Sequence, residues 1–137
     1  MKINRQILRG YDVRGLVDKD LNPQSVELLG KGFAAMLTGQ RGRTVVLGRD
    51  CRTSSTVFRD VLSQTLNGCG VDVIDLGVVP TPLTYYAANT LPEVDGRIMI
   101  TGSHNPPEYN GFKVGLGKTT LHGAEIQQLL RLIEANV

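Results

Sequence analysis

The amino-acid sequence predicts an α/β fold: a three-layer α/β/α domain with a mainly parallel (mixed) central sheet. Two short runs, the largely β-branched 44–47 without alternation and 97–100, which ends in three apolar residues, are typical of strands buried on both faces. Segments with helical periodicity separate the predicted strands. Because strands and helices alternate in short units, we expect parallel strands with helices on both faces of the sheet.

Size and composition limit the function classes that need to be considered. The 137 residues fit one domain, so we expect residues 1–137 to form a single α/β domain. With 41% hydrophobic and 20% charged residues, the chain has a globular balance, and no apolar run reaches bilayer length. The net charge of +2, without a long basic run, gives nucleic-acid binding no support. Two cysteines and the lack of an apolar leader favour a cytoplasmic protein with reduced thiols.

The first half of the chain predicts two helices and two strands. Asn22 can cap a helix that begins at Pro23 and stops near Gly39. One face of this helix carries Val26, Leu29, Gly30, Phe33 and Leu37. A strand at 44–47 and a loop at 48–55 follow, and then a helix that ends near 68–70. We expect the apolar side of that helix to carry Val57, Val61, Leu62, Thr65 and Leu66. The next strand is expected at 71–76.

The second half predicts a short helix at 82–89, a buried strand at 97–100, a further strand and a final helix. The segment 111–114 alternates only weakly, so we expect it to be an edge strand. The final helix is indicated by apolar residues at i, i+3, i+4 and i+7, namely Ile126, Leu129, Leu130 and Ile133.

Three loops that leave the predicted strands, 48–55, 77–82 and 101–107, should meet at one edge of the sheet. Ligands bind at this edge of parallel sheets. Arg49, Arg52 and Lys113 are expected on or near it, and Arg14 could join them. Arginine suits phosphate because its planar guanidinium makes two parallel hydrogen bonds. A set of cations at this edge therefore favours phosphate chemistry, although each of these residues also suits a solvated surface.

The loop at 101–107, here called the serine loop, has the sequence Thr-Gly-Ser-His-Asn-Pro-Pro. Gly102 permits a sharp turn out of the strand, and Pro106 stiffens the exit. The Ser103 hydroxyl would then be held on a rigid, exposed turn, as a nucleophile or a phosphorylated serine requires. The same residues also suit a plain polar turn.

The serine loop resembles the active-site serine loop of the α-D-phosphohexomutases, the phosphomannomutase/phosphoglucomutase family. Two further segments join the resemblance in the same order along the chain, and the three together span most of it. They are Tyr11-Asp12-Val13-Arg14-Gly15 and the loop 48–55, while the serine-loop match extends through Lys113.

The resemblance implies a reaction that interconverts hexose 1-phosphate and hexose 6-phosphate. Ser103 would be the phosphoserine, which gives its phosphoryl group to the sugar and regains one from the bisphosphate intermediate. Mg²⁺ would bind an oxygen of this phosphoryl group, so Ser103 is also the implied metal contact. His104 and Lys113 would transfer protons or stabilise charge. The resemblance implies two further roles. Tyr11, Arg14 and Asn105 would shape the site, and Arg49, Asp50 and Arg52 would brace the loop.

The chain departs from the family in what it lacks. The resemblance implies four domains, with an Asp-rich metal loop in the second, and no such loop is present in this sequence. We therefore expect the first domain of a longer isomerase, inactive in isolation, whose partners are a hexose phosphate and the remaining domains. An alternative is a stand-alone module that binds phosphate or sugar phosphate without covalent catalysis. A serine hydrolase is a third hypothesis, but Ser103 lacks the G-x-S-x-G context.

Overall fold

The computed structural model describes residues 3–9, 12–117 and 119–135. A short 3₁₀ helix, Arg5–Ile7, precedes the strands β1 (Val13–Leu16), β2 (Thr44–Arg49), β3 (Asp72–Val78), β4 (Gly96–Ile100), β5 (Tyr109–Leu116) and β6 (Thr119–Thr120). The α-helices are α1 (Pro23–Gly39), α2 (Thr53–Gly68), α3 (Thr81–Thr90) and α4 (Ala124–Ala135). Among the helices described in these ranges, none combines the length and apolar character needed to cross a membrane.

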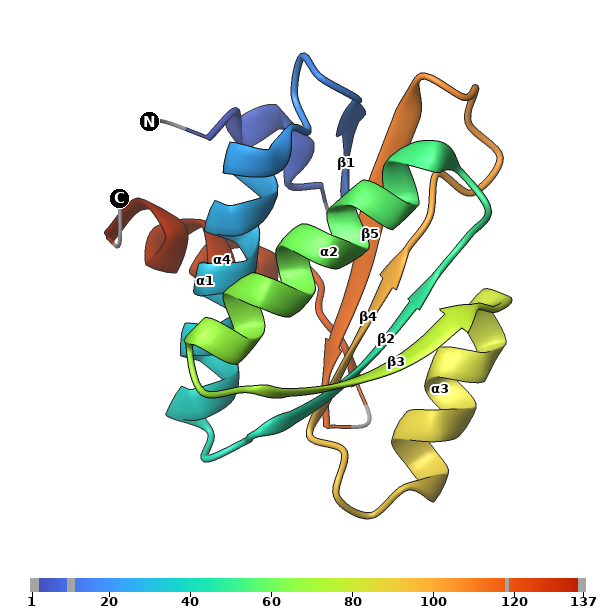
Figure 1. Ribbon diagram of the computed structural model, residues 1–137. Coiled ribbons are helices and arrows are strands. Elements are labelled where there is room, and N and C mark those ends of the chain that lie inside the picture. Colours follow the sequence, from blue (N-terminus) through green and yellow to red (C-terminus); the bar gives the residue numbers. More distant parts are fainter. Residues whose placement is uncertain (1–2, 10–11, 118, 136–137) are drawn as a thin grey trace.

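The sheet has the strand order β1-β5-β4-β2-β3, and β6 pairs with β5 (Figure 1). The pairs β2–β3 and β2–β4 are parallel, whereas β4–β5 and β1–β5 are antiparallel. The predicted α/β fold with a mixed, mainly parallel central sheet is therefore confirmed. Since β3, β2 and β4 run in the same direction, the loops that follow them lie at one edge of the sheet.

The sequence predicted an edge strand at 111–114, and this prediction is wrong. The segment belongs to β5, which lies between β1 and β4 and pairs with both. Alternation could not reveal this, because six of the eight residues of β5 are buried. The strand β1, a partner from the start of the chain, was not predicted as a strand at all. It is β1 that converts β5 into an interior strand.

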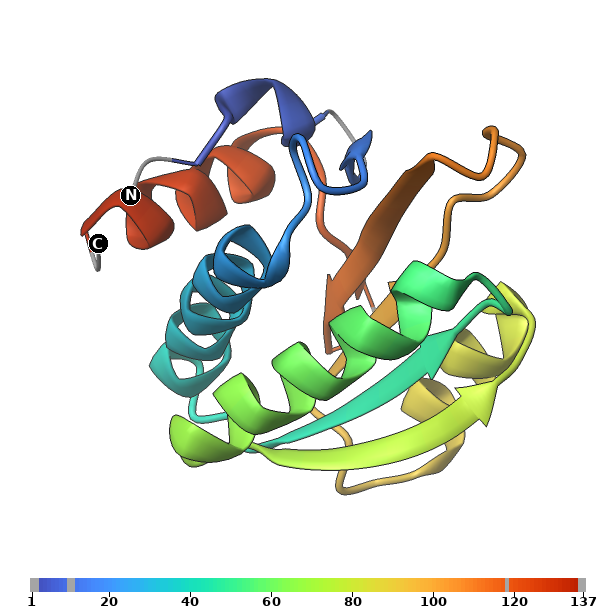
Figure 2. The same ribbon diagram turned by 45° about the horizontal axis from the view of Figure 1, so that its top comes forward.

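Helices cover both faces of the sheet (Figure 2). The larger apolar core lies between the sheet and α1, α2 and α4, and includes Val45 and Leu47 of β2. Val46, the residue between them, belongs to a smaller core with Ala87 and Ala88 of α3. Successive residues of a strand point to opposite faces, so this split places α3 on the face opposite to α1 and α2.

Local signals explain the boundaries and faces of the helices. The Asn22 side chain accepts a hydrogen bond from the Ser25 N–H at 2.9 Å, and Ser25 Oγ accepts one from the Asn22 N–H. This capping box begins α1 where the sequence predicted it. In α2 the buried face is shifted from the predicted one: Val57 is 47% exposed, whereas Phe58 is buried and packs against Phe112 of β5.

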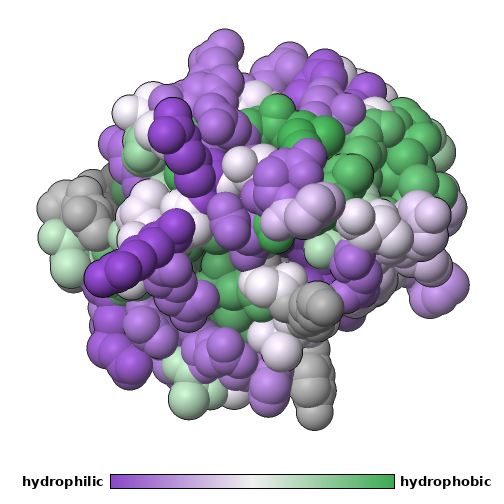
Figure 3. Space-filling view, turned by 90° about the horizontal axis from the view of Figure 1, so that it is seen from below, coloured by the Kyte–Doolittle hydropathy of each residue, from purple (hydrophilic) through white to green (hydrophobic). Residues whose placement is uncertain are grey.

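The surface carries a few large apolar side chains outside these cores. Figure 3 shows that hydrophilic residues cover much of the face seen from below, with hydrophobic residues gathered towards its upper right. Exposed apolar side chains near the carboxyl end of β3 and on α3 include Val78, Leu83 and Tyr86. Both cysteines, Cys51 and Cys69, are exposed free thiols.

Candidate active site

Ser103 lies in the loop that joins β4 to β5, at the carboxyl edge of the parallel strands. Its side chain is exposed, and its backbone has a φ of 53°. Such a left-handed conformation costs a non-glycine residue about 1–2 kcal/mol, so the surrounding structure has to impose it. The Ser103 hydroxyl has no hydrogen bond to any residue in the part of the chain that the structure describes. It is therefore accessible for chemistry.

Backbone contacts hold the entry to the serine loop. The Thr101 N–H donates to the Gly111 carbonyl at 2.9 Å, which continues the β4–β5 pairing by one residue. The Ser103 N–H donates to Thr101 Oγ1 at 2.9 Å, and the Asn105 N–H donates to the Gly102 carbonyl at 3.0 Å. The turn thus begins immediately beyond the strand end.

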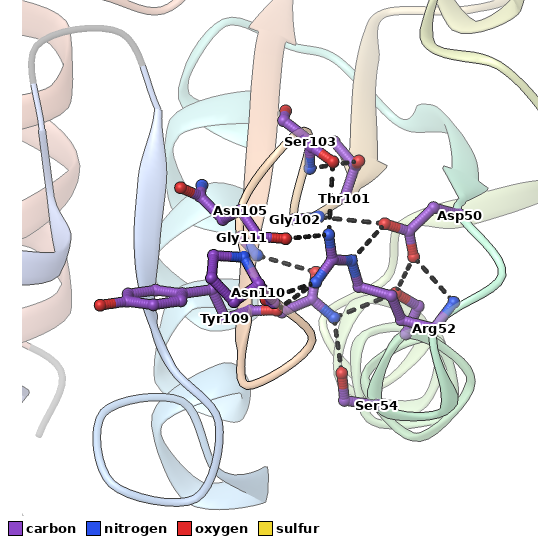
Figure 4. A network of polar contacts seen from close by, with 12 residues as sticks. Asp50, Arg52, Ser54, Thr101, Gly102, Ser103, Asn105, Tyr109, Asn110 and Gly111 are labelled. Atoms are coloured by element: carbon purple, nitrogen blue, oxygen red, sulfur yellow. Dashed lines mark hydrogen bonds and ion pairs between the residues drawn. The ribbon is translucent and has the colours of Figure 1, made fainter.

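Arg52 spans the concave side of the loop (Figure 4). Its Nη1 group donates to the carbonyl oxygens of Pro106 at 2.8 Å and Tyr109 at 3.1 Å. Its Nη2 group donates to the carbonyl oxygens of Asn105 at 2.8 Å and Ser103 at 3.3 Å. One guanidinium therefore contacts the loop at four places along its length.

Asp50 holds both Arg52 and the start of the loop. Asp50 Oδ2 accepts hydrogen bonds from Arg52 Nε at 3.1 Å and from the Gly102 N–H at 3.0 Å. Its Oδ1 accepts from Ser55 Oγ at 2.5 Å and from the Arg52 N–H at 3.1 Å. Partial burial raises the pKa of Asp50, but the hydrogen bonds from Ser55, Gly102 and Arg52 outweigh it and lower the pKa below its usual value. Asp50 is consequently a carboxylate at neutral pH.

Asn110 closes the network from the strand side, and the sequence did not identify it as a site residue. It is fully buried, and its Nδ2 donates to Ser54 Oγ at 2.8 Å and Ser55 Oγ at 3.0 Å. Its Oδ1 accepts from the Gly111 N–H at 2.8 Å. A polar amide within a strand of apolar residues and glycines is the signal that could have revealed it, because buried amides need partners.

Arg14 and Lys113 lie on the same face of the sheet. Arg14 is opposite Gly111 in the β1–β5 register, and Lys113 is two residues further along β5. Phe112 points to the other face, towards Phe58 of α2. The half-buried Arg14 pairs with Asp12 at 2.8 Å, which balances part of its charge. The side-chain ammonium group of Lys113 makes no hydrogen bond or ion pair with any residue in the described ranges, although its backbone belongs to the β4–β5 pairing.

Two other residues from the sequence prediction, Asn105 and His104, belong to the serine loop itself. Asn105 is half-buried, and both its N–H and its carbonyl group are hydrogen-bonded. His104 is exposed directly after Ser103. Tyr11 lies outside the described residues.

Arg49 is separated from Asp50 and Arg52. It is the last residue of β2, and its Nη1 lies 3.5 Å from Oδ1 of Asp75 in β3. Arg59 of α2 contacts the same carboxylate at 2.8 Å. Burial raises the pKa of Asp75, but the hydrogen bonds from Arg59 and the Gly77 N–H lower it below its usual value. Arg49 thus belongs to a charge cluster between β2, β3 and α2.

The described part of the chain contains no group of three or more His, Cys, Asp or Glu side chains that could hold a metal ion. Near Ser103, Asp50 already accepts four hydrogen bonds from protein groups. The residues present therefore do not by themselves fit a complete Mg²⁺ site, since Mg²⁺ requires near-octahedral oxygen coordination.

Comparison with known proteins places these features in a family. Residues 5–136 match the family model described as phosphoglucomutase/phosphomannomutase, alpha/beta/alpha domain I. A phosphoglucomutase from Neisseria meningitidis is 43% identical over 133 residues, and a phosphomannomutase/phosphoglucomutase from Pseudomonas aeruginosa is 42% identical over 130 residues. These alignments cover 96% and 95% of this chain, but 28% of each relative.

Solved structures give the same result. A phosphoglucomutase/phosphomannomutase family protein from Burkholderia thailandensis has a TM-score of 0.91 and 39% identity, with 98% of this chain and 31% of that chain covered. A putative phosphomannomutase from Thermus thermophilus has a TM-score of 0.86 and 29% identity, with coverages of 97% and 30%. The chain thus spans less than a third of the length of the relatives it matches. It belongs to the phosphoglucomutase/phosphomannomutase family, in which it corresponds to the alpha/beta/alpha domain I.

Proposed function

We propose that this chain is the phosphoserine-bearing domain of a phosphohexomutase, an enzyme that interconverts hexose 1-phosphate and hexose 6-phosphate. The observation that carries the proposal is Ser103: an exposed serine with a φ of 53°, held at the carboxyl edge of three parallel strands. The printed names of the relatives support the reaction class. Because the alignments cover 28% of each relative, we propose that such an enzyme carries its sugar specificity in parts that these 137 residues do not include.

The proposed chemistry is phosphoryl transfer to and from Ser103 Oγ. In the first half, the bond between phosphorus and Ser103 Oγ breaks while a sugar hydroxyl oxygen bonds to phosphorus and its proton passes to a base. In the second half, Ser103 Oγ loses its proton and bonds to the other phosphorus of the bisphosphate, while the bond from that phosphorus to its sugar oxygen breaks and the sugar oxygen takes up a proton. Because the transition state of phosphoryl transfer is loose, positioning and charge stabilisation supply most of the catalysis.

His104 and Lys113 are the proposed groups for proton transfer and charge stabilisation. His104 is adjacent to Ser103 in the chain, and an imidazole ring carries nitrogens that can donate or accept a hydrogen bond. Lys113 has no carboxylate partner among the described residues, and it shares a sheet face with Arg14. A phosphoserine carries about −1.5 to −2 charges at neutral pH, so nearby cations reduce the cost of holding it. Tyr11, Arg14 and Asn105 are proposed to shape the site.

Magnesium is proposed as the metal of the complete enzyme, where it would neutralise charge on the transferred phosphoryl group. In this chain the phosphorylated Ser103 would be its one contact, and the other ligands would come from a separate domain. We also propose that the 137 residues alone have no appreciable mutase turnover. Robust conversion of glucose 1-phosphate by the isolated chain with Mg²⁺ would contradict this division of the site.

The experiment that tests the proposed function is phosphorylation of the full-length enzyme by a hexose 1,6-bisphosphate, followed by peptide mapping with mass spectrometry. We expect the phosphoryl group on Ser103, and we expect its loss in the variant Ser103→Ala. The matched control is Ser63→Ala on α2, which removes a serine hydroxyl remote from the serine loop. Phosphorylation of the Ser103→Ala variant at an unchanged level would show that another residue is the acceptor.

A further inference from the structure

The hydrogen-bonding capacity of Arg52 is fully used within the protein. A guanidinium has five N–H donors: one on Nε and two on each Nη. Nε donates to Asp50, the Nη1 pair to Pro106 and Tyr109, and the Nη2 pair to Asn105 and Ser103. No donor remains for a phosphate group. In this respect Arg52 differs from Lys113, whose side-chain ammonium group has no hydrogen-bond partner among the described residues.

The charge of Arg52 is also balanced locally. Arg52 and Asp50 side chains are 18% and 21% exposed, and their ion pair of 3.1 Å is therefore screened less than a surface pair. Because the pair is electrically neutral, its effect on a phosphate at Ser103 is geometric.

The groups that accept hydrogen bonds from the Nη atoms of Arg52 show how it shapes the serine loop. All four are backbone carbonyl oxygens, and they are spread over residues 103–109. Converging on one guanidinium, these carbonyl groups point to the inside of the loop, away from a phosphoryl group on the exposed Ser103 side chain. Carbonyl oxygens facing such a dianion would repel it. One of these carbonyl groups belongs to Ser103, the residue with the left-handed backbone.

We propose that Arg52, held by Asp50, is a positioning residue for phosphoryl transfer: it gathers the loop carbonyls inward and so orients Ser103, without contacting phosphate. We call this arrangement the Asp50–Arg52 clamp. The inference rests on the proposed function for its catalytic consequence, whereas its effect on the loop can be measured independently. A lysine at position 52 keeps the charge but has three donors on one nitrogen, so it cannot make the five contacts.

The first test measures the loop in this chain by amide hydrogen exchange, using NMR. We expect Arg52→Lys to speed exchange of the Gly102 and Asn105 amides about tenfold or more, because local opening becomes easier. The matched control is Arg59→Lys, which makes the same change in the cluster around Asp75. Exchange of these two amides at the unaltered rate in Arg52→Lys would overturn the inference, whatever the enzyme does.

The second test measures turnover in the full-length enzyme. Misplacing a nucleophile by a fraction of an ångström to an ångström lowers kcat, so we expect Arg52→Lys to reduce kcat about 10- to 100-fold with KM nearly unchanged. A second variant, Gly102→Ala, should show the same split, since its added Cβ displaces the guanidinium without removing it. A raised KM with unchanged kcat would instead identify Arg52 as a phosphate ligand and overturn the proposal.

The two measurements separate failure of the clamp from failure of the proposed function. If the unaltered enzyme never acquires phosphate on Ser103, the role of Arg52 in phosphoryl transfer is overturned together with the proposed function. Loop protection would still depend on Arg52 in that case. If phosphate is acquired but kcat is the same in Arg52→Lys and in the control Arg59→Lys, the positioning role alone is overturned.

Discussion

The substitution Gly102→Ala is the cleanest perturbation of the Asp50–Arg52 clamp, because it removes no polar group. A Cβ at position 102 would lie 2.5 Å from Arg52 Nε and 2.7 Å from Nη1, well inside van der Waals contact. Gly102 does not occupy the left-handed region, so an alanine is compatible with its backbone. The guanidinium must therefore move, and it is the far end of a flexible side chain held only by its hydrogen bonds.

The magnitude follows from what that movement breaks. Overpacking a well-packed site costs about 1–3 kcal/mol, and each hydrogen bond to a charged group contributes about 1.5–3 kcal/mol. Because the site is partly exposed, water replaces some of the broken hydrogen bonds. We expect the free energy of unfolding to fall by about 2–4 kcal/mol, which lowers the Tm of a chain of this size by roughly 6–15 °C.

The assay is equilibrium denaturation of this chain in urea, monitored by circular dichroism. The matched control is Gly39→Ala, at the last residue of α1, where an added Cβ meets nothing within 4 Å. We expect this control to leave stability unchanged or to raise it by up to about 1 kcal/mol, since alanine favours helix over glycine. The comparison separates the contact with Arg52 from a general effect of replacing glycine.

A double-mutant cycle decides whether Arg52 is the cause. With Arg52→Ala already in place, the Cβ at position 102 has lost its obstacle, so Gly102→Ala should cost less than about 0.5 kcal/mol. The coupling between the two sites would then be about 1.5 kcal/mol or more. Equal costs of Gly102→Ala in the two backgrounds would refute the steric explanation and, with it, the picture of a guanidinium that is held in place.

Three other outcomes are expected. The pKa of Asp50 is lowered in the folded state, so the Asp50 carboxylate stabilises the fold fully above the unfolded-state pKa, and this stabilisation is lost as the pH falls below about 4. Asp50→Asn should therefore flatten the pH dependence of the free energy of unfolding in acid. Phe58→Ala should lower the free energy of unfolding by about 3–5 kcal/mol in urea denaturation, because Phe58 is buried against Phe112. Arg97 stacks on the Tyr85 ring at 4.2 Å. Burial raises the pKa of the Tyr85 phenol, but hydrogen bonds with Thr120 and Arg97 outweigh this effect and lower the pKa below its usual value. Arg97→Met should therefore raise the pKa of Tyr85, as measured by ultraviolet titration.

The elements that the sequence predicted well are those with local signals. Asn22 and Pro23 mark the start of α1, and the four apolar positions of α4 all prove buried. Capping and helical periodicity act within a few residues of the chain, so they can be recognised without the rest of the fold. The short runs at 44–47 and 97–100 were likewise recognisable, because each carries three consecutive apolar residues, as strands buried on both faces do.

The errors arose where distant segments decide. Whether 111–114 is an edge or an interior strand depends on β1, which is nearly a hundred residues earlier in the chain. The buried face of α2 was displaced by one position, since Val57 and Phe58 both fit a helical pattern with later residues. Phe112 of β5 resolves this ambiguity by packing against Phe58. Neither partner is visible in the local pattern.

The candidate site shows the same limit at the level of single cations. Arg49 and Arg52 are three residues apart, and the sequence placed both at the phosphate-binding edge. However, β2 extends through Arg49, so this side chain follows Leu47 towards α2 and meets Asp75. Arg52 lies beyond the strand end, where Asp50 turns it back onto the serine loop. The sequence shows how many cations lie near this edge, but the position at which β2 ends decides which carboxylate each arginine contacts.

This assignment changes the electrostatics of the proposed reaction. Arg49 and Arg52 are paired with Asp75 and Asp50, and Arg14 shares its charge with Asp12. Lys113 is therefore the cation of the predicted set that has no carboxylate partner within the described ranges. A dianionic phosphoserine needs a charge that is not already balanced. Within this domain the proposed charge stabilisation consequently depends on Lys113, while Arg52 supplies the shape of the loop.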